Sequence, residues 1–198
     1  MSEKSEQKKQ YIVDTAREVF VEKGYKNVTM KDIVDACGIS RGGLYLYFSS
    51  TQEIFLEVLE AERKGQEDSG EMEELLGKDA FASDILALFL KEQKKELLRR
   101  KNNLTMAAYE YFFAHKVPKR DNLLRKRFDT AVRIIGRLIA AGVENGEFYC
   151  EDTMGAARNI MYVLEGLKIA SQTRGVTEEM VDREILYIMQ GLIIENEE

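Results

Sequence analysis

The sequence predicts an all-α protein with a small N-terminal helical domain and a larger C-terminal one. Proline, which breaks helices, occurs once in 198 residues, and 44% of the residues are hydrophobic. These hydrophobic residues recur at intervals of three and four, the period of an amphipathic helix. The segment TMKDIVDACGISRGGLYLYF (Thr29 to Phe48) is typical of two short helices joined by a tight turn. The predicted domains span residues 7–64 and 65–198.

The first helix is predicted from Lys8 to Lys23, because Gly24 ends a stretch of sequence with one apolar stripe. Tyr25 and Val28 follow this glycine, and we expect them to pack beneath the next two helices. The stripe itself consists of Ile12, Ala16, Val19 and Phe20.

The second helix carries its own start and stop residues. Thr29 suits an N-cap, and Asp32 three residues later completes a capping box. Gly38 stands where a left-handed C-terminal cap is expected, and Ser40 is a second N-cap candidate that begins the next helix. The expected apolar face consists of Ile33, Val34, Ala36 and Cys37.

The third helix is short and is predicted to have two different faces. Leu44 and Phe48 are four residues apart and face inward together. Gly42 and Gly43 are poor helix formers, by about 1 kcal/mol each, so close approach to another surface is one reason for them. The outward positions are Arg41, Gly43, Tyr45 and Tyr47. This pattern indicates a helix that enters the major groove of DNA, and the alternative is an ordinary helical hairpin.

Residues Gln7 to Leu59 resemble the N-terminal domain of the TetR family of bacterial transcriptional regulators. The likeness is carried by AREVFVEKGYKNVTMKDIVDACGISRGGLYLYFSSTQEIFLEVL (Ala16 to Leu59), with its Gly-Ile-Ser turn, its LYxYF motif and the helix that follows directly. The resemblance implies a dimeric, ligand-responsive repressor that binds double-stranded DNA at an inverted-repeat operator. The C-terminal remainder resembles the family only in length and helical character.

The resemblance also implies roles for single residues. Arg41 is expected to reach a guanine, and Gly43 to allow close approach, for example to a thymine methyl group. Tyr45 and Tyr47 match aromatic positions that contact the DNA backbone. Many members carry a lysine where this chain has Ser49, Ser50 and Thr51, so the phosphate contact there is expected to be weaker, with Lys8 or Lys26 compensating. The full predicted DNA-binding set is Thr29, Lys31, Arg41, Gly42, Gly43, Tyr45, Tyr47, Ser49 and Thr51.

The rest of the chain is predicted to consist of helices separated by short breaks. A helix over 50–64, with Ile54, Phe55, Val58 and Leu59 on one face, connects the two domains. The acidic segment 65–74 is expected to be a loop or a frayed helix end. The remaining predicted helices are Asp84–Arg100, capped by Ser83 and with Ile85, Leu88, Phe89 and Leu97 as apolar residues, then Asn103–His115, Asp121–Asn145 after a break at Pro118, Thr153–Thr173 and Thr177–Glu195.

A ligand cavity in the C-terminal domain is expected mainly from the resemblance. Methionine and aromatic side chains with few polar groups suit a small, largely apolar effector. The alternative is that most of these residues simply pack in the core, as aromatic stripes at helical spacing usually do. The predicted lining residues are Met106, Tyr109, Phe112, Phe113, Phe128, Arg133, Arg158, Met161, Tyr162 and Glu165.

The last two predicted helices carry wide apolar stripes, and the resemblance favours a homodimer formed through them. The alternative is that the stripes complete a monomeric core. In a two-fold dimer, two recognition helices about 34 Å apart match successive major grooves. The predicted interface residues are Ile160, Leu164, Leu167, Ile185, Ile188, Met189 and Leu192.

Other classes of function find little support. His115 is the only histidine, no cysteine pair or carboxylate set has metal-ligand spacing, and no glycine-rich phosphate loop occurs, so we expect no metal, no cofactor and no enzyme activity. Cys37 is interpreted as a small buried residue rather than a redox sensor. The alternative function is a helical protein-interaction or ligand-carrier module that does not use DNA.

Charge and terminal sequence suggest where such a protein acts. The net charge is −6, but residues 1–50 carry nearly equal numbers of basic and acidic side chains, so the negative charge belongs to the C-terminal part. DNA affinity is therefore expected to depend on salt with a modest slope. The sequence shows no signal peptide and no membrane span, and two distant cysteines suit a reducing compartment. The expected location is the bacterial cytoplasm, in association with the nucleoid when DNA is bound.

Overall fold

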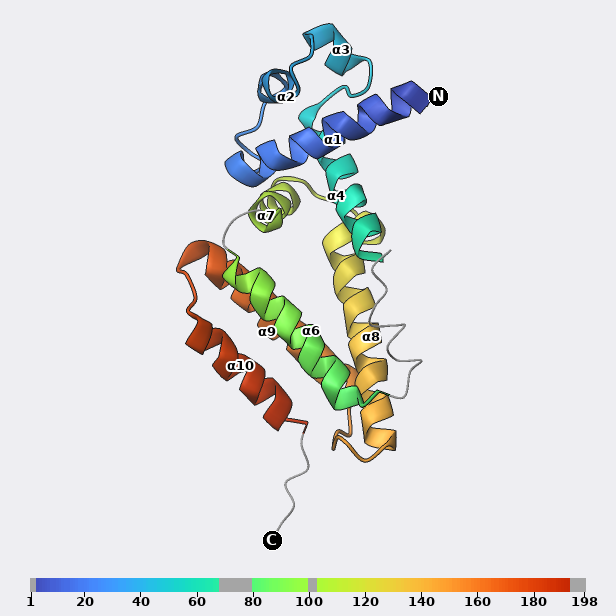
Figure 1. The fold of residues 1–198 in the computed structure, drawn as a ribbon, viewed down its shortest axis with the longest axis vertical. Coiled ribbons are helices and arrows are strands. Elements are labelled where there is room, and N and C mark those ends of the chain that lie inside the picture. The colour runs from blue at the N-terminus through green and yellow to red at the C-terminus, as the bar shows by residue number, and fades with distance from the viewer. Residues whose placement is uncertain (1–2, 68–79, 100–102, 193–198) are drawn as a thin grey trace. The chain divides into compact units, whose positions relative to one another are not determined.

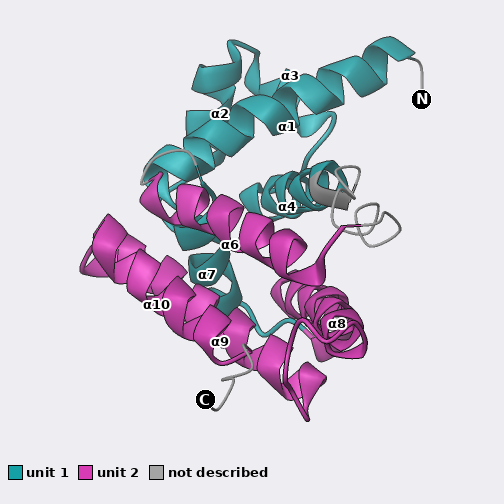
Figure 2. Ribbon diagram, turned by 60° about the horizontal axis from the view of Figure 1, so that its bottom comes forward, with its two compact units in different colours: residues 1–69, 101–117 teal, residues 70–100, 118–198 magenta. Residues whose placement is uncertain are grey.

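A computed structural model of the chain describes residues 3–67, 80–99 and 103–192. Within these ranges the regular structure is entirely helical (Figure 1), which confirms the predicted all-α class. The chain forms two compact units, which Figure 2 colours separately. Unit 1 comprises residues 1–69 and 101–117, and unit 2 comprises residues 70–100 and 118–198.

Unit 1 is built around a core of large apolar side chains that local sequence places on one face of each helix. The predicted stripe of the first helix is buried throughout, and Leu44, Phe48 and Phe55 are almost fully buried as well. The first helix begins at Glu3, earlier than the predicted Lys8. The helices of this unit are α1 (Glu3–Lys23), α2 (Met30–Cys37), α3 (Arg41–Tyr45), α4 (Thr51–Glu67) and α7 (Thr105–Ala114).

Helix α7 belongs to unit 1, although its residues fall within the predicted C-terminal domain, 65–198. The reason is an aromatic cluster between distant parts of the chain. The ring of Tyr111 lies 5.0 Å from that of Tyr25 and 5.4 Å from that of Phe55, measured between centroids. Phe20 completes the cluster, at 4.7 Å from Phe55. The compact units therefore do not follow a single cut of the chain, and the domain boundary between residues 64 and 65 stays a prediction.

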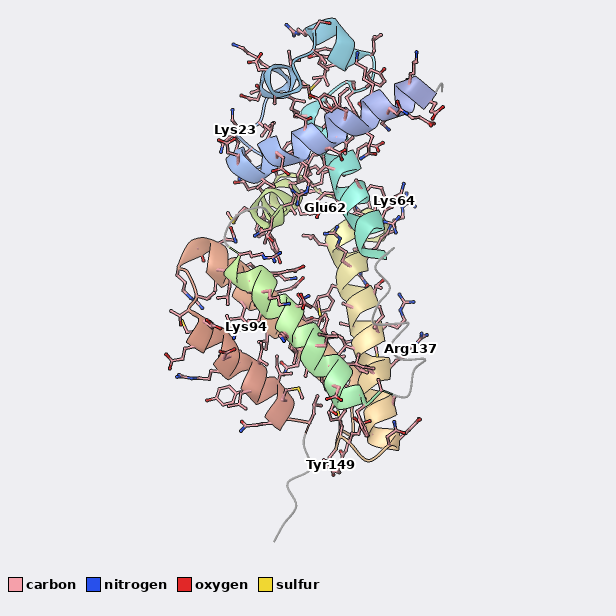
Figure 3. The ribbon with its side chains drawn as sticks, viewed as in Figure 1. Lys23, Glu62, Lys64, Lys94, Arg137 and Tyr149 are labelled. Atoms are coloured by element: carbon pink, nitrogen blue, oxygen red, sulfur yellow. The ribbon has the colours of Figure 1, made fainter. Side chains whose placement is uncertain are left out.

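Unit 2 surrounds a second apolar core. Glycine allows close packing at two points. A Cβ atom at Gly142 would lie 2.3 Å from the ring of Phe148, which follows the same helix, and one at Gly136 would meet the sulfur of Met154 in the next helix. Lys94 of the first helix, which Figure 3 labels, forms ion pairs with Glu178 and Asp182 of the last. The elements are α6 (Ala82–Leu98), a 3₁₀ turn (Lys119–Asp121), α8 (Leu123–Glu144), α9 (Thr153–Thr173) and α10 (Glu178–Gln190).

Most predicted helix boundaries in unit 2 are confirmed to within a few residues. Helix α9 has the predicted bounds, Thr177 caps α10, and Gly146 follows α8 with a φ of 75°. The end predicted for the last helix lies outside the described residues, as does most of the predicted loop 65–74, whose residues 65–67 are the last turn of α4.

Two predictions about α6 and one about α2 were wrong. Ser83 does not cap α6, because the helix begins at Ala82 and the Ser83 hydroxyl donates to Glu147 at 2.9 Å. Leu88 is exposed rather than on the buried face, and so is Ala36 in α2. In α6 and in α2 the buried face is therefore narrower than the set of apolar residues in the helix, since only one side of each helix meets a neighbour.

None of the helices that the structure describes is both long enough and apolar enough to cross a lipid bilayer.

Candidate nucleic-acid interface

Helix α2 begins at the predicted capping box. The Thr29 hydroxyl accepts the backbone N–H of Asp32 at 3.3 Å, and the Asp32 carboxylate accepts the backbone N–H of Thr29 at 2.8 Å. The hydroxyl also donates to that carboxylate, at 2.6 Å. The capping role is therefore confirmed, and the predicted phosphate contact of Thr29 requires its hydroxyl to leave Asp32.

Asp32 also ties the start of α2 to the end of α1. Lys23 donates to its other carboxylate oxygen at 2.7 Å, and Figure 3 labels this lysine at the C-terminal end of α1. The bonds from Lys23 and Thr29 hold the pKa of the Asp32 carboxyl well below its usual range. The bond between Lys23 and Asp32 in turn raises the pKa of Lys23. The ionised carboxylate at this helix N-terminus fixes the direction in which α2 leaves the turn.

The turn between α2 and α3 has the geometry expected from its sequence. Gly38 adopts a φ of 62°, the left-handed conformation that glycine favours, and its N–H bonds back to Asp35 at 3.3 Å. Ser40 then caps α3 by accepting the N–H of Gly43 at 3.1 Å. Buried Ile33 and Leu44 hold the two helices together. These contacts confirm the predicted helix-turn-helix and fix the orientation of α3.

The outward face of α3 carries a cation, two tyrosines and a leucine. The Arg41 guanidinium lies over the Tyr45 ring, 5.5 Å from its centroid. Tyr45 is exposed, whereas Tyr47 lies past the last helical residue and is half-buried. Leu46, which is not among the predicted DNA contacts, is 83% exposed between them. The inward positions of Leu44 and Phe48 predict this exposure, because the residue midway between them must point away from the core.

The two glycines of α3 differ in their surroundings. A Cβ atom at Gly43 would lie 3.2 Å from the Ser40 hydroxyl, so the cap itself favours glycine there. A Cβ atom at Gly42 would meet no atom within 4 Å. Nothing in the fold around Gly42 thus requires glycine, although glycine weakens a helix. Close approach of DNA to the backbone at Gly42 is one reason for a glycine at this position.

The start of α4 differs from the lysine-containing version common in the resembled family. Ser49 donates both its backbone N–H, at 2.7 Å, and its hydroxyl, at 2.8 Å, to the carboxylate of Glu53. These bonds lower the pKa of Glu53. Because the Ser49 hydroxyl is already bonded to a carboxylate, a phosphate must displace that bond, which agrees with the weaker anchor expected here.

The remaining predicted DNA contacts lie on the same unit but are spread around it. Lys31 is exposed on α2, and Thr51 is half-buried at the first turn of α4. Of the two suggested compensating lysines, Lys8 is exposed on α1 and Lys26 is exposed in the turn after it. Charge on this unit is therefore distributed over three elements rather than concentrated on α3.

The predicted ligand residues do not form one cluster. Met106, Tyr109, Phe112 and Phe113 belong to α7 in unit 1, and the other six belong to α8 and α9 in unit 2. Within unit 2 the structure brings Phe128 and Tyr162 together, with ring centroids 5.0 Å apart. Arg158, Met161, Tyr162 and Glu165 share one side of α9, whereas Arg133 is exposed on α8 and bonds to Thr130.

A cleft of about 340 Å³ lies elsewhere, between α1 and α4 of unit 1. The Arg17–Glu62 ion pair, at 2.6 Å, crosses it, and no predicted ligand residue lines it. In the described part of the chain no group of three or more metal-ligating side chains is placed to hold an ion.

Most of the residues predicted for the dimer interface pack instead in the hydrophobic core of unit 2. Ile160, Leu164, Ile188 and Leu192 are buried in unit 2, and Leu167, Ile185 and Met189 are partly buried against them. The opposite faces of these helices are exposed and partly apolar. They present Tyr162, Gly166 and Ile169 on α9, and Leu186 and Tyr187 on α10.

With this geometry in place, sequence comparison decides the family. The profile of "Bacterial regulatory proteins, tetR family" matches residues 12–58, and that of "Tetracyclin repressor-like, C-terminal domain" matches residues 85–195, more than half of the chain. The chain belongs to the TetR family. It is therefore a DNA-binding transcriptional regulator, and the helix-turn-helix of α2 and α3 is its DNA-binding element. Nothing in the comparisons supports the interaction-module or carrier alternative.

Individual relatives agree with this assignment. The uncharacterised HTH-type transcriptional regulator YfiR of Bacillus subtilis is 36% identical over 141 residues, which cover 69% of this chain and 66% of that protein. A structure described as a transcriptional regulator from Saccharomonospora viridis in complex with choline matches with a TM-score of 0.80 and 21% identity, covering 96% of this chain and all of that one. The structure of FadR from Bacillus subtilis in complex with stearoyl-CoA matches with a TM-score of 0.68 and 21% identity, covering 92% of this chain and 98% of that one.

Proposed function

We propose that this TetR-family chain is a homodimeric repressor that binds an inverted-repeat operator and is released from it by a small, largely apolar effector. One observation carries the DNA-binding part: a capped helix α3 presents Arg41 and Tyr45 beside Gly42, whose bare backbone nothing in the chain requires. As a DNA-binding regulator, the protein is expected in the bacterial cytoplasm and on the nucleoid when bound.

Each predicted contact has a chemical role in this proposal. Arg41 can donate two hydrogen bonds to a guanine once it leaves the Tyr45 ring. Tyr45 and Tyr47 offer hydroxyl groups to phosphates, together with Thr29, Lys31, Ser49 and Thr51. Gly42 and Gly43 let the backbone of α3 approach the base edges. Leu46 adds an exposed apolar group suited to contact with a thymine methyl or a sugar.

The operator is testable by selecting bound duplexes from a pool of random DNA with the full-length protein at moderate salt. The proposal expects an enriched inverted repeat whose half-site centres lie about 34 Å apart or a multiple of that. Arg41→Ala should either remove the preference at one base position or abolish binding. Arg137→Ala, which removes an exposed arginine from α8 (labelled in Figure 3), should leave the selected sequence unchanged. Folded wild-type protein that enriches no sequence would refute the proposal.

For the dimer, we propose the outer faces of α9 and α10 as the contact surface. Gly166 lies in the middle of α9, is exposed, and would have free space around a Cβ atom. Glycine there weakens the helix without a reason inside the chain, and close approach of a partner helix is such a reason. Ile169, Leu186 and Tyr187 supply apolar area around it, and the residues first predicted for the interface support these faces from beneath.

For the effector, we propose a site in unit 2 around Phe128, Met161, Tyr162 and Glu165. Burial raises the pKa of Glu165, against the opposing effect of Lys168, so a polar or cationic group on a largely apolar ligand would find a partner there. The effector would act by binding more tightly to the dimer whose DNA-binding units have the wrong separation. Choline and stearoyl-CoA, the ligands named for the two structural neighbours, are suitable first probes; release of operator DNA by either, lost in Glu165→Ala, supports this site.

A further inference from the structure

Helix α7 contacts the turn between α1 and α2, which positions the helix-turn-helix. Three residues make these contacts: Glu110 and Tyr111 within the helix and His115 just after its end, here called the α7 clamp. Phe113, between them in sequence, is exposed. The helix is bounded by the two points, near residues 100 and 117, where the chain passes between unit 2 and unit 1. Among the described helices of unit 1, α7 is the one from which the chain leads to unit 2 in both directions.

The first contact is made by the Glu110 carboxylate, which accepts the backbone N–H of Lys26 at 3.0 Å. The same carboxylate covers Gly24, where a Cβ atom would lie only 2.7 Å from it. Gly24 also has a φ of 73° and ends α1, its N–H bonding to Phe20 at 2.9 Å. One carboxylate, 84 residues away in sequence, therefore covers the turn and satisfies a backbone donor in it.

The second and third contacts hold the side chain of Tyr25 from two directions. Its hydroxyl is 2.8 Å from Nε2 of His115, and its ring meets the Tyr111 ring edge-on at 5.0 Å. Burial is the main cause of a raised pKa of Tyr25, and an electrostatic interaction with Tyr111 adds to it. Tyr111 is 2% exposed, and its hydroxyl also accepts a bond from Gln52 of α4 at 3.3 Å. The clamp thus joins α7, the α1–α2 turn and α4.

The turn controls where α3 points. Thr29 starts α2 three residues after Lys26, and buried Ile33, Cys37 and Leu44 make α2 and α3 move together. A shift of the α1–α2 turn would reach α2 first and α3 through it, and would leave the side chains that α3 presents to DNA unchanged. In a dimer such a shift alters the separation of the two recognition helices more than the sequence that each one reads.

We infer that Glu110, Tyr111 and His115 are positioning residues for DNA binding: through the α1–α2 turn they set the half-site spacing that the dimer accepts. This rests on the proposed dimer and its inverted-repeat operator. The α7 clamp would connect the chain near unit 2 to the helix-turn-helix by a route other than α4. Its three residues would act on DNA binding without contacting DNA.

The test compares full-length Glu110→Ala and Tyr25→Phe with wild type. Tyr25→Phe removes the bond to His115 and keeps the ring contacts. The DNA pool carries the half-site selected by wild type with the spacer varied by single base pairs. We expect both variants to lose preference for the wild-type spacing by about 5-fold or more, while their affinity for an isolated half-site stays within about 2-fold of wild type. Glu110→Gln, which retains an acceptor oxygen for Lys26, should keep most of the preference, and Glu22→Ala, at an exposed site on α1, should keep all of it.

A second readout does not depend on DNA. Amide hydrogen exchange over residues 24–29 should quicken in Glu110→Ala and Tyr25→Phe, with the core amides of α1 unchanged. Unchanged exchange in this turn, or an unchanged spacing preference in both variants, would overturn the inference. If wild type itself selects no inverted repeat, the proposed function fails, and this outcome is visible before any variant is compared.

Discussion

Gly42 is the residue at which helix stability and DNA binding make opposite demands. Replacing it with alanine should strengthen α3, by up to about 1 kcal/mol, because a Cβ atom there meets no neighbour. The same methyl group lies on the exposed side of the helix, where it would separate the backbone from a base edge. We expect Gly42→Ala to be at least as stable as wild type in chemical denaturation, and to bind its operator about tenfold more weakly in a titration.

Gly43→Ala is the matched control for this prediction. Its methyl group would press on the Ser40 hydroxyl, so it should weaken the cap and lower stability as well as affinity. A Gly42→Ala variant that binds its operator as tightly as wild type would show that α3 does not approach DNA at this position.

Asp32 makes the start of α2 sensitive to acid. Its pKa is lowered in the folded state, so its contribution to stability is complete above the ordinary value near pH 4 and is lost as the pH falls toward the folded value. Melting temperatures measured between pH 5 and pH 2 should fall more steeply for wild type than for Asp32→Asn. Parallel curves for the two proteins would contradict this assignment.

Helix α6 shows how an element can depend on a cap from a distant part of the chain. The carboxylate of Glu147 accepts the backbone N–H groups of Ala82 and Ser83, at 3.1 and 2.9 Å, as well as the Ser83 hydroxyl. Burial raises the pKa of Glu147, but these bonds outweigh it and leave the pKa lowered. Glu147→Ala should reduce the free energy of unfolding by about 1–2 kcal/mol in urea denaturation, since it removes the acceptor for two helix-terminal donors.

Ser83→Ala provides the comparison. It removes only the hydroxyl donor and leaves both backbone bonds to Glu147, so its effect on the urea midpoint should be clearly smaller. Equal losses for the two variants would mean that the bond from the Ser83 hydroxyl to Glu147, rather than the two backbone bonds, is the dominant contact at this helix start.

At the scale of the whole molecule, the proposed function requires two copies of the chain to associate. Gly166→Leu places a side chain on the proposed contact face of α9, where the chain itself leaves open space, so the protomer should remain folded. We expect a dimer dissociation constant at least about tenfold weaker in sedimentation experiments, with a parallel loss of operator affinity, because two half-sites are then bound independently. Ala87→Leu, on the exposed side of α6, should leave both unchanged. A Gly166→Leu protein that stays fully dimeric would exclude this face.

Local sequence was sufficient for the DNA-binding element. The capping box at Thr29 and Asp32, the left-handed Gly38 and the cap at Ser40 involve residues no more than three or four apart, so their patterns predict their geometry. The helical period likewise identified the buried stripes of α1 and α4. The same period could not say which neighbour covers a stripe, and for this reason Leu88 and Ala36 were placed on the wrong face.

Contacts between distant residues were decided only by the folded chain. No short-range pattern connects Glu147 with the start of α6, or Glu110 and His115 with a turn about 85 residues earlier. The apolar residues of α9 and α10 suited a monomer core and a dimer interface equally well in sequence, and the tertiary structure assigns most of them to the core. A helix nucleates from its neighbours along the chain and so is readable from them, whereas its partners depend on the packing of the entire core.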